Sequence, residues 1–423
     1  MPKIIPLLLC AAAMGAAPKR VLYVTHSAGF RHGSIETSIP VMQRLSPSIE
    51  VTATEDLSRI TTAGLRDFDG LFFFTSGGLD LSAEQKAALL EFVRGGKGFG
   101  GAHSATDTLY TWPEYGEMIG AVFDGHPWAQ EVSIDVDDPY HPATRHLAPS
   151  FRISDEIYQF RSFSRERVNV LLKLDTRSVD PRAPGVNRTD GDFALTWTRA
   201  YGMGRVFYTA LGHGDETWLD ARFQTLLRQA LLWLTGELPR PEIAPDGVVN
   251  AASFAAGAVA PGSLISLFGA DLTSGSSATA TDGPLKLAGS SVLVNGASIP
   301  LMFASPGQIN GRLPPGAVNG EIAVESATGR GTARPLRVEA AAPGIFGIAR
   351  EGEILSIYAT GLGGATPVVN IGAARAEVRY AGPGPGPAGL DLVQAAIPAG
   401  TTGRVPVTLQ VGEGRSNAVE VEI

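Results

Sequence analysis

The chain has 423 residues, which is too many for one hydrophobic core, so two or three domains are expected. Its formal net charge is −8 and its pI is about 5.5. Binding to phosphates needs clustered Lys and Arg, and the chain has no such cluster, so a nucleic-acid partner is not expected.

The N-terminus has the pattern of an export signal. Lys3 precedes an apolar run over residues 4–13, and small residues around Ala13 and Gly15 fit a cleavage site. The run is too short to persist as a membrane anchor, and no later segment has about eighteen uninterrupted apolar residues. We therefore expect a signal peptide over residues 1–17 and an exported mature chain. The only cysteine, Cys10, lies inside that signal, so the mature chain would have neither a thiol nor a disulfide.

Residues 18–238 alternate short apolar runs with helical patterns. This alternation is typical of βαβ units, and it predicts a flavodoxin-like α/β domain with a parallel sheet covered by helices on both faces. A capping box at Ser82 and Gln85 opens one helix, and an amphipathic helix over residues 221–234 closes the domain. Strands are expected at residues 21–25, 51–54, 70–75, 99–103, 132–135, 170–174, 193–198 and 204–211.

The second half of the chain has a different composition. Three prolines over residues 236–245 indicate a linker, assigned to residues 239–245, and beyond it glycine and proline rise while histidine is absent. Residues 260–269 are echoed by residues 351–361, which indicates an internal repeat. We expect two tandem Ig-like β-sandwich modules, over residues 246–340 and 341–423.

All seven histidines lie in the first half of the chain. In an open parallel sheet, ligands bind beyond the carboxyl ends of the strands. His26, His103 and His213 each follow a predicted strand, so they should converge on one rim. Three imidazoles suit zinc or another divalent first-row metal, but they could also supply a general base, and each could be a partly buried turn residue. Both functional alternatives stay open from the residues alone.

Residues 100–107 predict a sharp strand-to-helix turn that presents His103. The pattern resembles the nucleophile elbow of class I glutamine amidotransferases, but His103 occupies the position of their cysteine, so amidotransferase activity is excluded. Asp215 stands two residues after His213, where it could orient that ring or cap a helix. We therefore expect His103, His213 and Asp215 to be the catalytic residues.

The loops around these histidines carry further polar and aromatic residues. The glycine-bearing loop over residues 26–33 precedes a helix, where backbone amides could hold a hydroxylated or anionic ligand. Residues 124–128 and 155–158 are expected to be loops that mix rings with polar groups, which suits stacking on a sugar and bonding to its hydroxyls, although the rings could equally be core anchors. The expected substrate-binding residues are Arg31, His32, Asp107, Asp124, His126, Glu156 and Tyr158.

Four segments in the first half together resemble the ThuA family: residues 24–32, 101–107, 123–127 and 208–213. That family is linked to the utilisation of trehalose and other disaccharides and has the glutamine amidotransferase-like fold. The resemblance implies a role on sugars, on oxidised (3-keto) glycosides made by a partner oxidoreductase. It also implies that His213 and Asp215 match two members of the amidotransferase triad, from which His103 departs.

The second half resembles a tandem module at the ends of many exported proteins of soil bacteria, through residues 250–254, 305–310, 342–346 and 358–363. That resemblance implies a spacer or a surface-binding appendage. The chain as a whole is thus expected to be an exported, carbohydrate-active hydrolase, lyase or isomerase that performs proton transfer or hydrolysis at a carbonyl-bearing sugar. A metal held by His26, His103 and His213 is the alternative to pure acid–base chemistry. A carbohydrate-binding protein without catalysis and a scaffold are the rival functions.

Overall fold

The computed structural model describes residues 17–423. Cys10 and nearly all of the predicted signal peptide lie outside these residues. The chain divides into two compact units: the first contains the residues up to Asp138 together with His146–Glu237, and the second contains Pro139–Arg145 and Leu238–Ile423. Among the helices of the described part, none is long and apolar enough to cross a bilayer.

The first unit is built on a sheet of nine strands in the order β2-β1-β3-β4-β11-β10-β9-β6-β7. One half of this sheet is parallel, as the sequence predicts, because its strands are short apolar runs joined through helices. These strands are β1 (Lys19–Val24), β2 (Ile49–Thr54), β3 (Gly70–Phe73), β4 (Gly98–Ala102) and β11 (Gly204–Thr209). Strands β3 and β4 are buried throughout, whereas β2, at the edge of the sheet, is only partly buried.

The other half of the sheet is antiparallel, so the expectation of a fully parallel sheet is wrong. Its strands are β10 (Ala194–Tyr201), β9 (Asn169–Leu174), β6 (Trp128–Val136) and β7 (Ser150–Ile157). The segment expected to be a loop at residues 155–158 instead begins with the end of β7. This strand is last in the sheet order and rich in polar residues, because an edge strand pairs on one side only, and its apolar pattern is therefore weak. A small separate ladder joins β5 (Val122–Phe123) to β8 (Phe160–Arg161).

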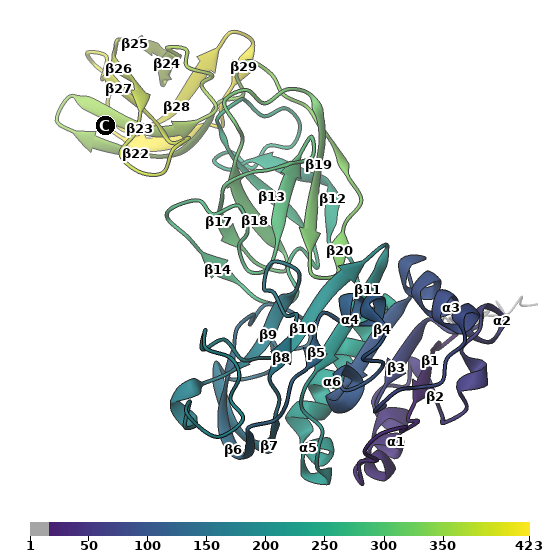
Figure 1. The fold of residues 1–423 in the computed structure, drawn as a ribbon. Helices are drawn as coiled ribbons and strands as arrows, with labels where there is room; N and C mark the ends of the chain where they lie inside the picture. The colour runs from purple at the N-terminus through teal and green to yellow at the C-terminus, as the bar shows by residue number, and fades with distance from the viewer. Residues whose placement is uncertain (1–16) are drawn as a thin grey trace, which may run out of the picture. The chain divides into compact units, whose positions relative to one another are not determined.

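Helices α3 and α6 show how local sequence and packing act together (Figure 1). Ser82 and Gln85 form the predicted capping box at the start of α3. Helix α6 packs against β3, β4 and β11, and a Cβ atom on Gly98 would lie 2.7 Å from the carbonyl oxygen of Leu234, so only glycine allows this approach. The helices are α1 (Ile35–Arg44), α2 (Thr62–Leu65), α3 (Ala83–Arg94), α4 (Pro113–Ile119), α5 (Asp215–Leu219) and α6 (Ala221–Thr235).

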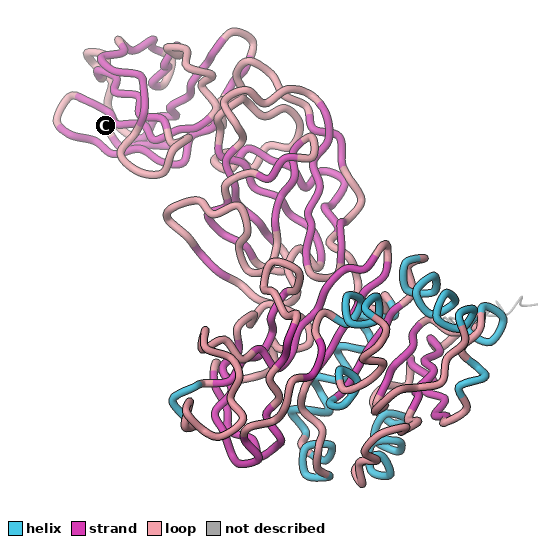
Figure 2. Tube along the Cα trace, viewed as in Figure 1, coloured by secondary structure: helices cyan, strands magenta, loops and turns pink. Residues whose placement is uncertain are grey.

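Strands and turns alone make up residues 238–423 (Figure 2). The first part of this unit has two antiparallel sheets that share one apolar core, to which Ile265 and Ile309 contribute from one sheet and Val292 and Ile322 from the other. It contains β12 (Glu242–Asn250), which begins inside the segment expected to be a linker, then β13 (Leu264–Ala270), β14 (Ala278–Thr279), β15 (Ser291–Val294), β16 (Ala297–Ser298), β17 (Leu301–Ala304), β18 (Gln308–Arg312), β19 (Gly320–Ser326), β20 (Gly329–Arg330) and β21 (Arg334–Leu336).

The second part repeats this organisation around a core of its own. Leu355 and Val393 come from one of its sheets, and Val369 and Val407 come from the other. The chain therefore carries two sandwich-like bodies after the α/β unit. The strands are β22 (Gly344–Glu351), β23 (Ile354–Thr360), β24 (Val368–Ile371), β25 (Ala374–Ala376), β26 (Val378–Pro383), β27 (Asp391–Ala396), β28 (Arg404–Val411), β29 (Gly414–Arg415) and β30 (Val419–Glu422).

Candidate functional site

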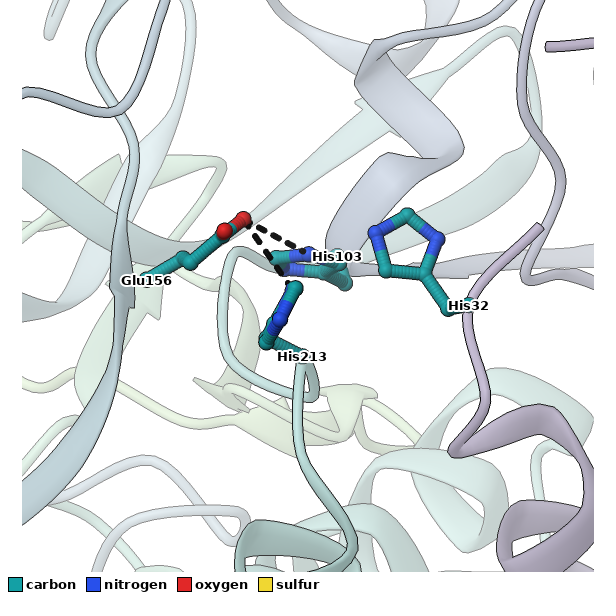
Figure 3. Close-up of side chains that lie close together, drawn as sticks. All are labelled: His32, His103, Glu156 and His213. Atoms are coloured by element: carbon teal, nitrogen blue, oxygen red, sulfur yellow. Dashed lines mark ion pairs between the residues drawn. The ribbon is translucent and has the colours of Figure 1, made fainter. Parts of the chain in front are cut away.

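Four side chains from distant parts of the first unit meet at the carboxyl edge of its parallel strands (Figure 3). His32 lies in the loop after β1, His103 directly follows β4, and His213 lies in the loop after β11. Glu156 comes from β7. One nitrogen or oxygen atom from each residue lies within 4.8 Å of the corresponding atom of the others. We call these four residues the His–Glu cluster.

The turn at His103 has the predicted strand-to-helix form. The strand β4 ends at Ala102, and a 3-10 helix follows over His103–Thr106. His103 has a φ of 46°, in the left-handed region, which costs a residue other than glycine about 1–2 kcal/mol. A Cβ atom on Gly101 would lie 2.8 Å from the Cβ of Ala105, so the turn also needs glycine at that position. The strained turn carries the side chain of His103 into the cluster.

The proton positions on His103 follow from its partners. The ring is fully buried, and its Nδ1 atom lies 2.8 Å from the carbonyl oxygen of Ala210. A carbonyl only accepts, so Nδ1 carries a proton, and in the neutral ring Nε2 has a free lone pair. Nε2 faces the hydroxyl of Tyr158 at 2.9 Å and Oε2 of Glu156 at 3.6 Å. Burial raises the pKa of Tyr158 well above its ordinary value, so this hydroxyl stays protonated and can donate.

Glu156 is the carboxylate at the centre of the site. Its Oε2 atom lies 3.1 Å from Nδ1 of His213, yet that nitrogen is buried and makes no hydrogen bond. Its Oε1 atom lies 3.8 Å from Nδ1 of His126, a ring that is about half exposed. Burial disfavours the ionised carboxylate, but the imidazoles of His103, His213 and His126 beside it outweigh burial and lower the pKa of Glu156. Glu156 is therefore ionised at neutral pH.

His32 completes the cluster from the side of α1. It is 5% exposed, and its Nδ1 atom has no hydrogen-bond partner. Its ring centre lies 4.6 Å from that of His103 and 5.3 Å from that of His213. Burial, together with the neighbouring imidazoles of His103 and His213, lowers the pKa of His32 to about 3. The ring is therefore neutral at physiological pH and has a lone pair available to a ligand.

Asp155 holds the loop that carries His213, and the sequence did not single it out for this role. Its buried carboxylate accepts hydrogen bonds from the backbone N–H groups of Gly212 at 2.8 Å and His213 at 3.0 Å. It also accepts from the hydroxyl of Thr217 at 2.8 Å. In the sequence, the only sign of this role was the acidic pair at residues 155–156. The pairing of β7 with β6 places both carboxylates near His213.

Seven of the expected site residues lie outside the cluster, and three of these have other partners or are exposed. His26 was expected as a metal ligand, but its Nδ1 atom contacts the carbonyl oxygen of Glu55 at 3.0 Å, and the ring beside His103 and His213 is that of His32. The expected pairing of Asp215 with His213 is not seen, because Asp215 is exposed at the first turn of α5 and Glu156 is the carboxylate beside that ring. Arg31 is exposed and pairs with carboxylates of its own region, at Glu55 and Glu36.

The remaining expected residues lie on loops that border the cluster. The carboxylate of Asp107 accepts a hydrogen bond from the hydroxyl of Tyr110. Burial raises the pKa of Asp107, although this hydrogen bond and the charges of His103 and His126 oppose the rise. Asp124 pairs with Arg161 at 3.7 Å. The rim beside Glu156 thus offers acceptors and donors that are partly open to solvent.

The sheet and the elbow turn define the first unit as a domain of the glutamine amidotransferase-like class, with histidine in place of the nucleophile. A family model described as ThuA, trehalose utilisation, matches residues 20–234. The chain belongs to this family.

Comparison with solved structures finds similar proteins. A ThuA-like protein from Bacteroides uniformis ATCC 8492 is 26% identical with a TM-score of 0.45, and the match covers 53% of this chain and 94% of that one. A ThuA-like protein from Parabacteroides merdae ATCC 43184 is 19% identical with a TM-score of 0.43, covering 54% of this chain and 94% of that one. Comparison with curated proteins finds no match.

Proposed function

We propose that the first unit is a carbohydrate-active enzyme whose reaction centre is the His–Glu cluster. Its substrate is a sugar that bears a carbonyl group, such as a 3-keto disaccharide or glycoside, and its chemistry is proton transfer that leads to hydrolysis or elimination. The family description, trehalose utilisation, supports the class of substrate. The observation that carries the chemistry is the convergence of three imidazoles and one carboxylate within 4.8 Å at the carboxyl edge of the sheet.

The cluster and its rim supply the groups that such a reaction needs. A C–H bond beside a ketone is acidic, so a carboxylate held next to it can accept the proton, and Glu156 has the lowered pKa of an ionised base. His126 is about half exposed and lies beside Glu156, where it can exchange protons with solvent. Asp107, which already accepts from the Tyr110 hydroxyl, and Asp124, which pairs with Arg161, would accept hydrogen bonds from sugar hydroxyls.

A role in binding alone is the rival function, and the site geometry favours catalysis over it. A sugar-binding platform needs exposed rings and hydroxyl partners but no convergent titratable groups. Here the ring centres of His103 and His213 lie 5.3 Å apart, and Glu156 contacts both rings. Perturbed titratable groups that gather in this way are typical of reaction centres.

The test is to incubate the purified chain with a 3-keto disaccharide, and separately with the same disaccharide unoxidised, and to follow both by NMR. We expect turnover of the keto sugar, loss of turnover in Glu156→Gln, and unchanged turnover in His26→Ala, a histidine outside the cluster. Binding of the sugar with no turnover by the wild-type chain would instead establish a carbohydrate-binding protein.

We further propose that the chain is exported and that its two sandwich-like modules are Ig-like spacers. The charged start at Lys3 and the apolar run after it support export. A partner sugar oxidoreductase would then supply the keto substrate. N-terminal sequencing of protein recovered from outside the cytoplasm should place the mature start near residues 16–18, and an intact Cys10 in that protein would contradict export by cleavage.

A further inference from the structure

Two buried nitrogens in the His–Glu cluster lack hydrogen bonds. They are Nδ1 of His32 and Nδ1 of His213. A buried polar atom without a partner costs about 1–3 kcal/mol, and native structures contain few of them, so two in one cluster call for a ligand. Figure 3 shows the rings of His32 and His213 beside that of His103, with the carboxylate of Glu156 pointing toward His103 and His213 from the side opposite His32.

The contacts of Glu156 point to a cation between it and the rings. Nε2 of neutral His103 and the carboxylate of Glu156 are both acceptors, yet they face each other at 3.6 Å. Nδ1 of His213 lies 3.1 Å from the same oxygen without the geometry of a hydrogen bond. Lone pairs that converge in this way repel one another unless a positive charge lies among them.

The hydrogen bond at Nδ1 of His103 is of the kind that metal-binding histidines make. Such rings donate their other N–H to a carbonyl or carboxylate, which fixes the tautomer and the ring orientation. The carbonyl of Ala210 does this for His103 at 2.8 Å. Asp155 fixes the backbone of His213 in turn. The Tyr158 hydroxyl, which lies 2.9 Å from Nε2 of His103, would give up that hydrogen bond when a metal binds.

We infer that the His–Glu cluster binds one divalent first-row transition-metal ion, with His32, His103, His213 and Glu156 as ligands. Three imidazoles and one carboxylate suit Zn²⁺ and its neighbours, whereas Mg²⁺ and Ca²⁺ prefer sites made of oxygen. In a tetrahedral site with bonds of about 2.0–2.1 Å, ligand atoms lie about 3.3–3.4 Å apart. The pairs at 3.1 and 3.6 Å already approach that spacing.

The inference deepens the proposed function and rests on it for the role of the metal, but not for binding itself. A bound divalent ion would polarise the sugar carbonyl as a Lewis acid. With the metal bound, Glu156 would be a ligand like the three rings and would no longer be the proton acceptor that it is in the proposed function without a metal. His126 and Asp107 on the rim would be the groups that exchange protons with the substrate.

The test uses the full chain, first analysed for metal by mass spectrometry, then freed of metal by chelation and titrated calorimetrically with Zn²⁺ and with Co²⁺. We expect one ion per chain and a Co²⁺ visible spectrum of a low-coordinate nitrogen and oxygen site. His32→Gln and Glu156→Gln should weaken Zn²⁺ binding by more than about 100-fold, beyond the effect of losing an outer partner of a ligand. The matched control His26→Gln should bind as the wild type does.

Circular dichroism of each variant distinguishes the loss of a metal ligand from the loss of the fold. The Glu156→Gln change is nearly isosteric, so it still tests the site if His32→Gln does not fold. Absence of saturable Zn²⁺ or Co²⁺ binding by the wild-type chain would overturn the inference, as would equal weakening by His26→Gln. Turnover of a keto sugar by metal-free protein would overturn the inferred role of the metal and leave the proposed function standing. Tight metal binding without turnover of any sugar would contradict the proposed function and leave the inferred metal site standing.

Discussion

Asp155→Asn should loosen the loop that carries His213. The wild-type carboxylate accepts four hydrogen bonds in a buried position, from the N–H groups of Gly212, His213 and Glu156 and from the hydroxyl of Thr217. Hydrogen bonds to a charged group contribute about 1.5–3 kcal/mol each. Asparagine retains one acceptor oxygen, but its NH₂ group would face at least one of the four donors and leave it unsatisfied, at about 1–3 kcal/mol. We expect the free energy of unfolding of the first unit to fall by about 2–4 kcal/mol.

Tryptophan fluorescence during urea unfolding isolates this effect, because all five tryptophans of the chain lie between residues 112 and 233. Thr217→Val is the matched control, since it removes one of the four donors and keeps the charge, and it should cost about 1–2 kcal/mol. Zn²⁺ affinity should also fall by about 10–100-fold in Asp155→Asn, as for the loss of an outer partner of a ligand. An unfolding midpoint equal to that of the wild type would refute the assigned role of Asp155.

Three further outcomes are expected. In metal-free protein His32 stays neutral down to a pKa of about 3, while the unfolded chain takes up the proton near 6.5, so stability should fall as the pH drops from 6.5 to 5, by at most about 1.4 kcal/mol per unit. Urea unfolding at both pH values should show a flatter dependence for His32→Gln, and equal slopes would count against a buried neutral ring. Gly98→Ala should cost about 1–3 kcal/mol because its Cβ meets the backbone of Leu234, whereas Gly78→Ala, with nothing within 4 Å, should be nearly neutral by thermal unfolding. Residues 238–423 expressed alone should give a β-sheet circular dichroism spectrum, and helical signal there would contradict the two sandwich-like cores.

Local features of the sequence determined the parallel half of the first unit. The apolar run at residues 70–75 supplies β3 (Gly70–Phe73), which is buried throughout, and the side chains of Ser82 and Gln85 cap a helix within one turn of chain. The small residues before His103 likewise define the elbow, because the turn depends on glycine within a few positions. These elements could be predicted because each is decided by neighbours along the chain.

Tertiary structure decided which side chains form the site. Sequence proximity favoured Asp215 as the partner of His213, but the carboxylate beside that ring is that of Glu156, 57 residues earlier, which the pairing of β7 with β6 places there. The same holds for His26 and His32, which are separated by one short loop. Only the course of that loop turns His32 inward and leaves His26 against Glu55. Which side chains meet at a sheet edge depends on strand order and loop path, and these are set by packing across the whole domain rather than by adjacent residues.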